Sequence, residues 1–475
     1  MKKKNEKIFY PSIFNDVLAP ITQGPSSSNT VGPYRIGRLA MQLLGTKPIY
    51  LSIRMSTKGG FKDTFFSMSS DKAFLAGLLD QDLVDSDLEE VYAKTKLAGL
   101  EYHFEFADDV PALPSEMGLL EIRSKTETIW LTGITLGGGE ILIKDLHGAP
   151  AGEVPSDRCS STAIELDGRH TQEIEVPGLV GTRKIDTVYP LCTKEAPKPP
   201  FVTSEGMLKY VKDTGKALWE CALDYEYSLI DCSTDEIWKY ADQTLSTSYA
   251  SIDAGYKPGN VFDGIIKAKA PDIKERMDHT QLLPTGLSDR GAIDAMAIME
   301  YSNAHGKIVC MPTGGASGLI PAAVRNAAES IGADHDAQIK ALLISGLLGV
   351  FYYPTHYHGG LGCQAEVGVA ASMAAGAMAS LVTDDAEAIE RAAVLAMQCL
   401  IGQLCDPIEG YTQVPCIIRN MASVPLAATC ANAAILGVDT VVSLDEMAQA
   451  VLRVGNKIHS VNDFGTCMCA CKKGE

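Results

Sequence analysis

Apolar and polar residues alternate in several short segments of the first 190 residues. The alternation runs over residues 49–55, 100–106, 121–123, 129–135 and 140–146. Such a pattern is typical of strands that bury one face and expose the other. Helical patterns lie between them at 71–79 and 88–97. We therefore predict a mixed α+β domain with an antiparallel sheet.

Beyond residue 204 the pattern becomes helical. Alanine-rich amphipathic segments recur at 292–304, 320–331, 336–349, 366–381, 385–401 and 421–436. Apolar residues spaced three and four positions apart turn one face of each helix toward a core. This half of the chain is therefore predicted to be all-α.

A proline-rich segment separates the two patterns. The sequence Ala-Pro-Lys-Pro-Pro at 196–200 is typical of a linker. We predict an α+β domain over 1–190, a linker over 191–204 and an all-α catalytic domain over 205–475. The last domain ends in a cysteine-rich tail at 465–475.

Composition narrows the class of protein. The 475 residues are 46% hydrophobic and 21% charged, as in ordinary globular domains. A net charge of −18 argues against nucleic acid and anionic membranes as partners. The basic N-terminus is followed by no apolar stretch, which argues against a signal peptide. The most apolar run, 367–382, is too short to span a bilayer. Thirteen cysteines without a disulfide-like pattern indicate a reducing, cytoplasmic location.

Three of these cysteines stand next to residues that fix the backbone. Cys363 lies in Gly-Gly-Leu-Gly-Cys-Gln-Ala-Glu-Val-Gly, Cys405 in Leu-Cys-Asp-Pro-Ile, and Cys416 in Val-Pro-Cys-Ile-Ile-Arg-Asn. Glycine and proline impose unusual dihedral angles, so these sulfurs are candidates for a metal or iron–sulfur site. The alternative is that all three are buried core cysteines, which is a common fate of a free thiol.

Two loops resemble anion-binding helix starts. The first contains Ser26, Ser27, Ser28, Asn29 and Thr30, and the second contains Thr313, Gly314 and Gly315. Hydroxyl groups and free backbone N–H groups at such points bind carboxylates or phosphates, although the residues of the first loop alone favour a plain capped helix. A glycine-rich loop such as the second one could also bind the phosphate of pyridoxal phosphate. Enzymes with that cofactor need a lysine for the Schiff base. The only lysine in 308–456 is Lys340, which lies in an ordinary helical pattern, so the sequence argues against this alternative.

The cysteine motifs resemble those of the iron–sulfur L-serine dehydratases, which carry Gly-Cys-Gln-Gly/Ala-Glu-Val-Gly, Cys-Asp-Pro and Val-Pro-Cys. The resemblance extends to Gly-Pro-Ser-Ser-Ser and Pro-Thr-x-Gly in the two loops, and implies that these loops line the substrate pocket. It implies that Cys363, Cys405 and Cys416 hold a [4Fe-4S] cluster with one iron free of cysteine. It further implies that a tail cysteine, Cys467, Cys469 or Cys471, caps that iron in the resting enzyme.

The sequence departs from this family at two histidines. The family's Ser-Ser-His-Thr is Ser-Ser-Asn-Thr here, with Asn29, and the histidine of Gly-His-Gly-Thr-Asp is replaced by Met68, while Asp71 remains. Histidine is the natural base at neutral pH, so another group must remove the α-proton. Candidates are His356 and His358, five or more residues before Cys363, together with Asp71 and, more weakly, Lys58 and Lys72.

The resemblance implies a lyase that converts L-serine to pyruvate and ammonia and, by analogy, forms a homodimer. The substrate is a small molecule. Two alternatives stay open at this point. The same cluster chemistry can act on another small hydroxy or thiol amino or carboxylic acid, or the cluster can serve as a non-catalytic redox or iron sensor.

Overall fold

The structure is a computed structural model. It describes residues 9–24, 26–66, 68–84, 88–111, 116–153, 164–260, 262, 266–277, 279–283, 288–353, 361–404 and 413–462. Side chains at some of these positions, including Ser28, are outside the description.

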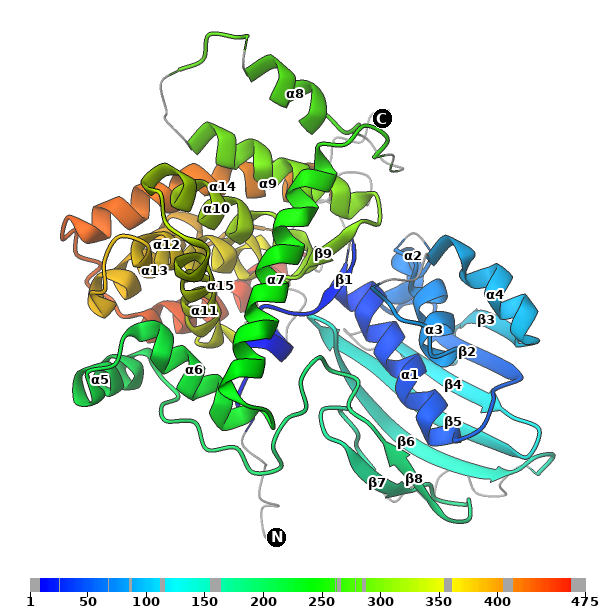
Figure 1. The fold of residues 1–475 in the computed structure, drawn as a ribbon. Helices are drawn as coiled ribbons and strands as arrows, with labels where there is room; N and C mark the ends of the chain where they lie inside the picture. The colour runs from blue at the N-terminus through cyan, green and yellow to red at the C-terminus, as the bar shows by residue number, and fades with distance from the viewer. Residues whose placement is uncertain are drawn as a thin grey trace.

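A five-stranded sheet forms the centre of the N-terminal region (Figure 1). Its order is β3-β2-β4-β5-β6, and its strands are β2 (Tyr50–Ser56), β3 (Glu101–Ala107), β4 (Glu116–Arg123), β5 (Glu127–Gly137) and β6 (Glu140–Pro150). Three pairs are antiparallel as predicted, whereas β2 and β3 run parallel. The parallel pair follows from its connection, because the chain crosses over through helices between these strands.

Helix α1 (Gly32–Leu44) packs on this sheet against β4, β5 and β6, and helix α3 (Ser70–Leu78) packs on α1. They approach closely because glycines face the opposing backbone. A Cβ on Gly37 would lie 2.4 Å from the carbonyl oxygen of Phe74, and one on Gly77 would lie 2.1 Å from that of Tyr34. This contact joins α1 to the second half of α3, and the Ser70 hydroxyl at the start of α3 donates to the Asn29 carbonyl in the turn before α1 (2.6 Å). The remaining elements here are α2 (Phe61–Thr64), η3 (Leu88–Glu90), α4 (Val91–Ala98), β7 (Gln172–Glu175) and β8 (Thr182–Ile185).

The first residues of the chain pack with the helical region. The π-helical turn η1 (Ile13–Val17) contacts α11, and strand β1 (Ile21–Gln23) pairs antiparallel with β9 (Lys307–Val309). The first residues of the chain therefore belong to the helical region. The chain then forms the sheet of the N-terminal region and afterwards returns to the helical region. The division at 1–190 and 205–475 stays a prediction, and this segment is the part that crosses it.

In the residues that the structure describes, the C-terminal region is helical apart from β9, as the periodicity predicts. Its helices are α5 (Ser204–Thr214), α6 (Leu218–Leu229), α7 (Thr234–Gly255), α8 (Ala270–Met277), α9 (Ser288–Asn303), α10 (Leu319–Ile331), α11 (His335–Val350), α12 (Val367–Ser380), α13 (Ala386–Leu400), α14 (Gln413–Ile435) and α15 (Leu444–Asn462). Helix α12 is almost wholly buried and packs against α10, α11, α13 and α14 (Figure 1). Its small Ala, Gly and Ser residues permit this central position.

Helix α14 begins earlier than the sequence pattern indicates. The pattern predicts a helix over 421–436, but the helix starts at Gln413 and continues through Pro425. Cys416 therefore lies in its first turn. This helix is long and apolar enough to cross a membrane, but half of its most apolar window is buried within the protein. It packs against α9, α12 and α13, which is the behaviour of a core helix.

A buried ionic cluster joins the N-terminal region to η1. The Arg169 guanidinium donates to both carboxylate oxygens of Asp16 (3.1 and 2.6 Å) and to Glu140. The guanidinium groups of Arg169 and Arg35 lie 4.5 and 3.7 Å from the Tyr189 ring centroid. Two charged carboxylates and an aromatic ring thus offset the cost of burying Arg169.

Candidate functional site

Cys363 is buried at the start of a short turn. It opens the one-turn 3-10 helix η6 (Cys363–Ala365), directly before α12. The preceding Gly362 has φ +79° and ψ 176°, a conformation that is essentially restricted to glycine. A Cβ on Gly362 would also lie 2.5 Å from the carbonyl oxygen of Gln403. The glycine before the cysteine therefore permits close contact with the chain that leads toward Cys405.

The side chain after this cysteine fixes the same contact. The Gln364 backbone N–H donates to the Gln403 carbonyl (3.2 Å), and the Gly402 N–H donates to Gln364 Oε1 (2.9 Å). Gln364 Nε2 donates to the carbonyls of Leu361 and Val451 (3.0 and 3.1 Å). All polar atoms of this fully buried side chain are used. Residues 402–404 are therefore held beside Cys363 as the chain approaches Cys405.

Helix α14 brings Cys416 to the same region. Arg419, one turn after this buried cysteine, donates from Nη1 to the Leu404 carbonyl (2.7 Å). Asn420 Nδ2 donates to the carbonyls of Gly315 and Cys416 (both 2.8 Å). Asn420 is fully buried, and its Oδ1 lacks a hydrogen-bond partner among the residues described. The helix is thus tied both to the segment before Cys405 and to the glycine-rich loop.

Gly315 leaves a hollow next to the sulfur of Cys416. A Cβ at this position would lie 3.5 Å from Cys416 Sγ and 3.6 Å from both carboxylate oxygens of Glu366. Loss of hydration raises the pKa of the Glu366 carboxyl, and the Thr313 hydroxyl offsets part of that rise. The missing side chain therefore opens a space that borders a thiol, a carboxylate and a glycine-rich backbone.

The glycine-rich loop has the predicted form. Its 3-10 turn η4 (Gly314–Ala316) follows Thr313 and leads into α10. The Ala316 N–H donates to the Thr313 carbonyl (3.1 Å), so the amides of Gly314 and Gly315 precede the first bond of the turn. Amides at this point are suited to an external anion.

The serine-rich turn uses several side chains internally. Ser26 caps the π-helical turn η2 (Ser27–Val31), and its Oγ accepts from the N–H and Nδ2 of Asn29 (3.4 and 3.3 Å). The Ser70 hydroxyl donates to the Asn29 carbonyl (2.6 Å) and lies 3.4 Å from Asn29 Oδ1. Thr30 Oγ1 donates to the Met68 carbonyl (3.4 Å). The turn is therefore braced against the start of α3.

This turn also meets the segment that leads into the glycine-rich loop. The Ser27 hydroxyl hydrogen-bonds the sulfur of buried Cys310, and burial raises the pKa of that thiol to about 12. The Cys310 N–H donates to the Pro20 carbonyl (3.1 Å). The two loops that the sequence nominates for substrate binding are thus adjacent.

The two acid–base candidates near this turn have different surroundings. Asp71 is 2% exposed, its Oδ2 accepts from the Tyr92 hydroxyl, and its Oδ1 has no partner among the described residues. Loss of hydration raises the pKa of Asp71, and the Tyr92 hydroxyl partly offsets this. Lys72 instead forms an ion pair with Glu89, whose carboxylate is exposed. Asp71 is therefore a buried carboxyl with one oxygen free of described partners, whereas Lys72 is held in an ion pair.

Several predicted residues lie outside the described part of the chain. They are His356, His358, Cys405, Cys467, Cys469 and Cys471. Within the part that is described, no group of three His, Cys, Asp or Glu side chains is arranged to hold a metal ion. The complete ligand set therefore depends on Cys405, which follows the last described residue of its segment, Leu404.

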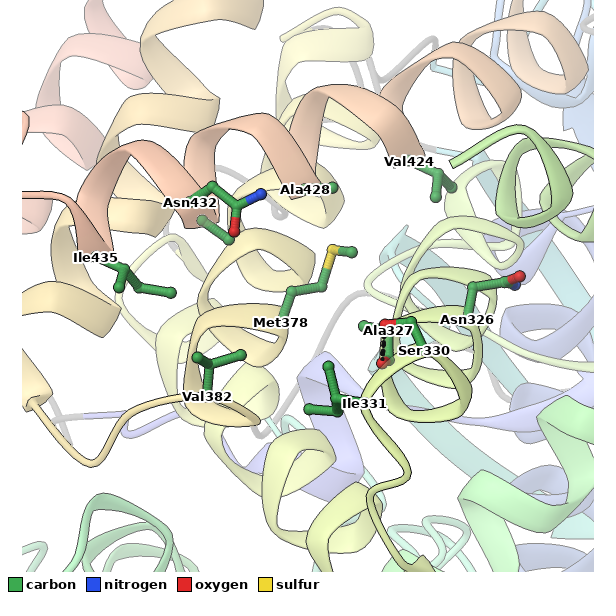
Figure 2. Close-up of a pocket in the computed structure, with 11 residues that line it drawn as sticks. Asn326, Ala327, Ser330, Ile331, Met378, Val382, Val424, Ala428, Asn432 and Ile435 are labelled. Carbon is green, nitrogen blue, oxygen red and sulfur yellow. Dashed lines mark hydrogen bonds between the residues drawn. The ribbon is translucent and has the colours of Figure 1, made fainter. Parts of the chain in front are cut away.

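A separate cavity of about 170 Å³ lies between α10, α12 and α14 (Figure 2). It is lined mainly by apolar side chains, including Met378, Val382 and Ile435, and carries no acid or base. Its residues come from the later parts of the three helices, whereas the loop and cysteine contacts lie at their beginnings. Its lining supplies no chemistry for catalysis.

Comparison with known proteins shows sequence similarity along most of the chain. The family described as serine dehydratase alpha chain matches residues 201–462. The chain belongs to this family.

An L-serine dehydratase of Streptomyces coelicolor is 28% identical over 466 residues, which cover 94% of each chain. L-serine dehydratase 1 of Escherichia coli is 26% identical over 455 residues, covering 92% of this chain and 94% of the relative. The L-serine dehydratase alpha chain of Peptoniphilus asaccharolyticus is 28% identical over 259 residues, covering 54% of this chain and 89% of the relative. The similarity therefore includes both regions of the chain.

Two residues of the site, Glu366 and Asn420, were not predicted from the sequence. Glu366 stands within the family-like motif around Cys363, and its carboxylate borders the hollow at Gly315. Asn420 follows Cys416 by only four residues and joins it to the glycine-rich loop. A sequence signal exists for both, since polar residues at fixed short distances from candidate ligands commonly orient those ligands.

Proposed function

We propose that this chain is a cluster-dependent L-serine dehydratase that forms pyruvate and ammonia. The observation that carries the proposal is that Cys416 Sγ and Glu366, three residues after Cys363, both border Gly315, in a chain of the serine dehydratase family. Residues 403 and 404, just before Cys405, are hydrogen-bonded to Gln364 and Arg419. The full-length relatives are named for this reaction. The reaction is a lyase elimination.

We assign Cys363, Cys405 and Cys416 as the ligands of a [4Fe-4S] cluster. Thiolates are the usual ligands of such clusters. Two of these cysteines are buried, and the hollow at Gly315 keeps side-chain bulk away from Cys416 Sγ. Asn420, which accompanies Cys416, also has a buried oxygen without a partner among the described residues. These features fit a bound inorganic group, which would supply Lewis acidity toward the substrate hydroxyl.

The chain's own residues bind and orient the substrate. We propose that the amides of Gly314 and Gly315 bind its carboxylate, since they precede the first hydrogen bond of the turn η4 and lie beside Cys416 and Glu366. The Ser26–Thr30 turn lines the same pocket, with its internal hydrogen bonds holding it rigid. A fixed carboxylate orients the α-carbon toward a base, which lowers the entropic part of the barrier.

We propose Asp71 as the base that removes the α-proton. Its buried Oδ1 is without a partner in the described structure, and its raised pKa brings it nearer to the range of an efficient base. His356 and His358 remain alternatives on sequence grounds alone. Single replacement of each histidine tests them, because unaffected turnover in both variants would remove them from the mechanism.

The deciding experiment is anaerobic purification with iron and sulfide analysis, followed by L-serine addition and a pyruvate assay. About four irons per chain with pyruvate formation is the expected result. A cluster without pyruvate would point to another hydroxy acid or to a sensor. Absence of iron would overturn the cysteine assignment.

The location and assembly follow from the same proposal. Open cluster sites need reduced thiols, so we expect the protein in the cytoplasm. The homodimer stays a prediction, which light scattering of the purified protein would test. A tail cysteine as a resting-state cap also stays a prediction, and Cys467, Cys469 and Cys471 can each be replaced to test it.

A further inference from the structure

Half-buried Glu366 has different surroundings from Glu226 and Glu390, two buried acids of this chain. Loss of hydration and the Thr313 hydroxyl are the influences on its pKa, and no charge of a described Lys or Arg contributes. By contrast, Glu226 accepts from the Ser12 hydroxyl and two backbone N–H groups, and Glu390 accepts from a hydroxyl and a backbone N–H. A carboxylate in such surroundings is costly unless a cation reaches it.

The absence of a side chain on Gly315 leaves room beside this carboxylate. Both of its oxygens lie 3.6 Å from the point where a Cβ of Gly315 would stand. The amides proposed to bind the substrate carboxylate belong to the same glycine turn. A substrate held there by its carboxylate would carry its α-substituents toward Glu366. An α-ammonium group is the substituent whose charge matches this acid.

We propose that Glu366 binds the α-ammonium group of the substrate and thereby selects amino acids over hydroxy acids. The inference rests on the proposed function, and it names the feature that separates the two substrate classes left open by the sequence. A charge-assisted hydrogen bond is among the stronger polar contacts, so its loss weakens binding by about 10- to 100-fold.

The test compares two unreactive ligands of the cluster-loaded protein by calorimetry. L-alanine has the ammonium group and lacks the hydroxyl, whereas propanoate lacks both. Wild-type protein is expected to bind L-alanine at least about 10-fold more tightly than propanoate. Glu366→Gln is expected to remove this difference, and Glu390→Gln, a matched buried acid on another helix, is expected to keep it. Iron content is measured for each variant.

Two outcomes would overturn the proposal. The first is an unchanged preference for L-alanine in an iron-loaded Glu366→Gln variant, and a fall in kcat alongside it would make Glu366 a base. If Glu366→Gln does not hold iron, Glu366→Asp keeps the charge and is expected to retain part of the preference. Equal binding of both ligands by Glu366→Asp is the second outcome.

The binding assay does not depend on turnover. If wild-type protein forms no pyruvate from L-serine, the proposed function fails, whereas the comparison of L-alanine with propanoate still reports on Glu366.

Discussion

The replacement Gly362→Ala should prevent cluster binding while leaving most of the protein folded. Gly362 precedes Cys363 and has φ +79° and ψ 176°. A methyl group there would lie 2.5 Å from the Gln403 carbonyl oxygen and 3.4 Å from Leu404 Cα. Because both are backbone atoms, the new group cannot be accommodated by a side-chain rotation. The two cysteine-bearing segments must move apart.

The cost can be approximated from its two parts. The backbone conformation disfavours any residue other than glycine by about 1–3 kcal/mol. Overpacking against a fixed backbone adds about 1–3 kcal/mol. The sum, about 2–6 kcal/mol, falls on the contact between residues 361–364 and 402–404. That energy is large enough to open the contact locally, and small enough that the central helices remain packed.

Iron and sulfide per chain after anaerobic reconstitution provide the assay. The variant is expected to retain its helical circular dichroism and to lose most of its iron. Gly437→Ala is the matched control, because Gly437 has φ +87° but no atom within 4 Å of the position that its new methyl group would take. It should cost about 1–2 kcal/mol and keep its iron. Full iron loading in Gly362→Ala would refute the contact between Cys363 and the approach to Cys405 as a requirement for the cluster.

Three further predictions address other parts of the molecule. Burial raises the pKa of Glu226 to about 7, so its contribution to stability is present at acidic pH and is lost as pH rises toward and through 7; urea midpoints from pH 4 to 8 should fall less steeply in Glu226→Gln. Arg169→Met leaves buried Asp16 without its guanidinium and should destabilise the protein by about 3–5 kcal/mol in urea unfolding, and a change within about 1 kcal/mol would contradict this. Asp71→Asn should lower kcat for L-serine by about 10²-fold or more. Lys72→Met should change kcat less than about twofold, because the Lys72–Glu89 ion pair is partly exposed. Equal effects of the two replacements would exclude Asp71 as the base.

Much of the fold could be predicted because its signals are local. The strands and most helices follow from periodicity, and the observed bounds of α10, α11 and α13 differ from expectation by one residue. The early start of α14 could not be predicted in this way, because Pro415 is as typical of a loop as of the first turn of a helix. The pairing of β1 with β9 has no local signal either, since its partners, such as Ile21 and Val309, lie far apart in the sequence.

The candidate site was predictable from the sequence only where its signals are local. The cysteines and the two loops are visible in the sequence because glycine, proline and serine mark their backbone conformations. The sequence does not show which side chains join them. Gln364, Arg419 and Asn420 do so by hydrogen bonds to backbone carbonyls of distant segments. Such partners depend on tertiary packing, so a one-dimensional pattern cannot assign them.

The structure gives a physical explanation for Asn29, which replaces one of the two family histidines. Its side-chain amide donates to Ser26 Oγ and lies within hydrogen-bond distance of the Ser70 hydroxyl through Oδ1. A neutral amide can act as donor and acceptor at once, and it has no proton to exchange at physiological pH. We infer that this position serves structure in this chain, linking the serine-rich turn to the start of α3. Proton transfer then requires a neighbour, and Asp71, the residue after Ser70, is held in place by that same link.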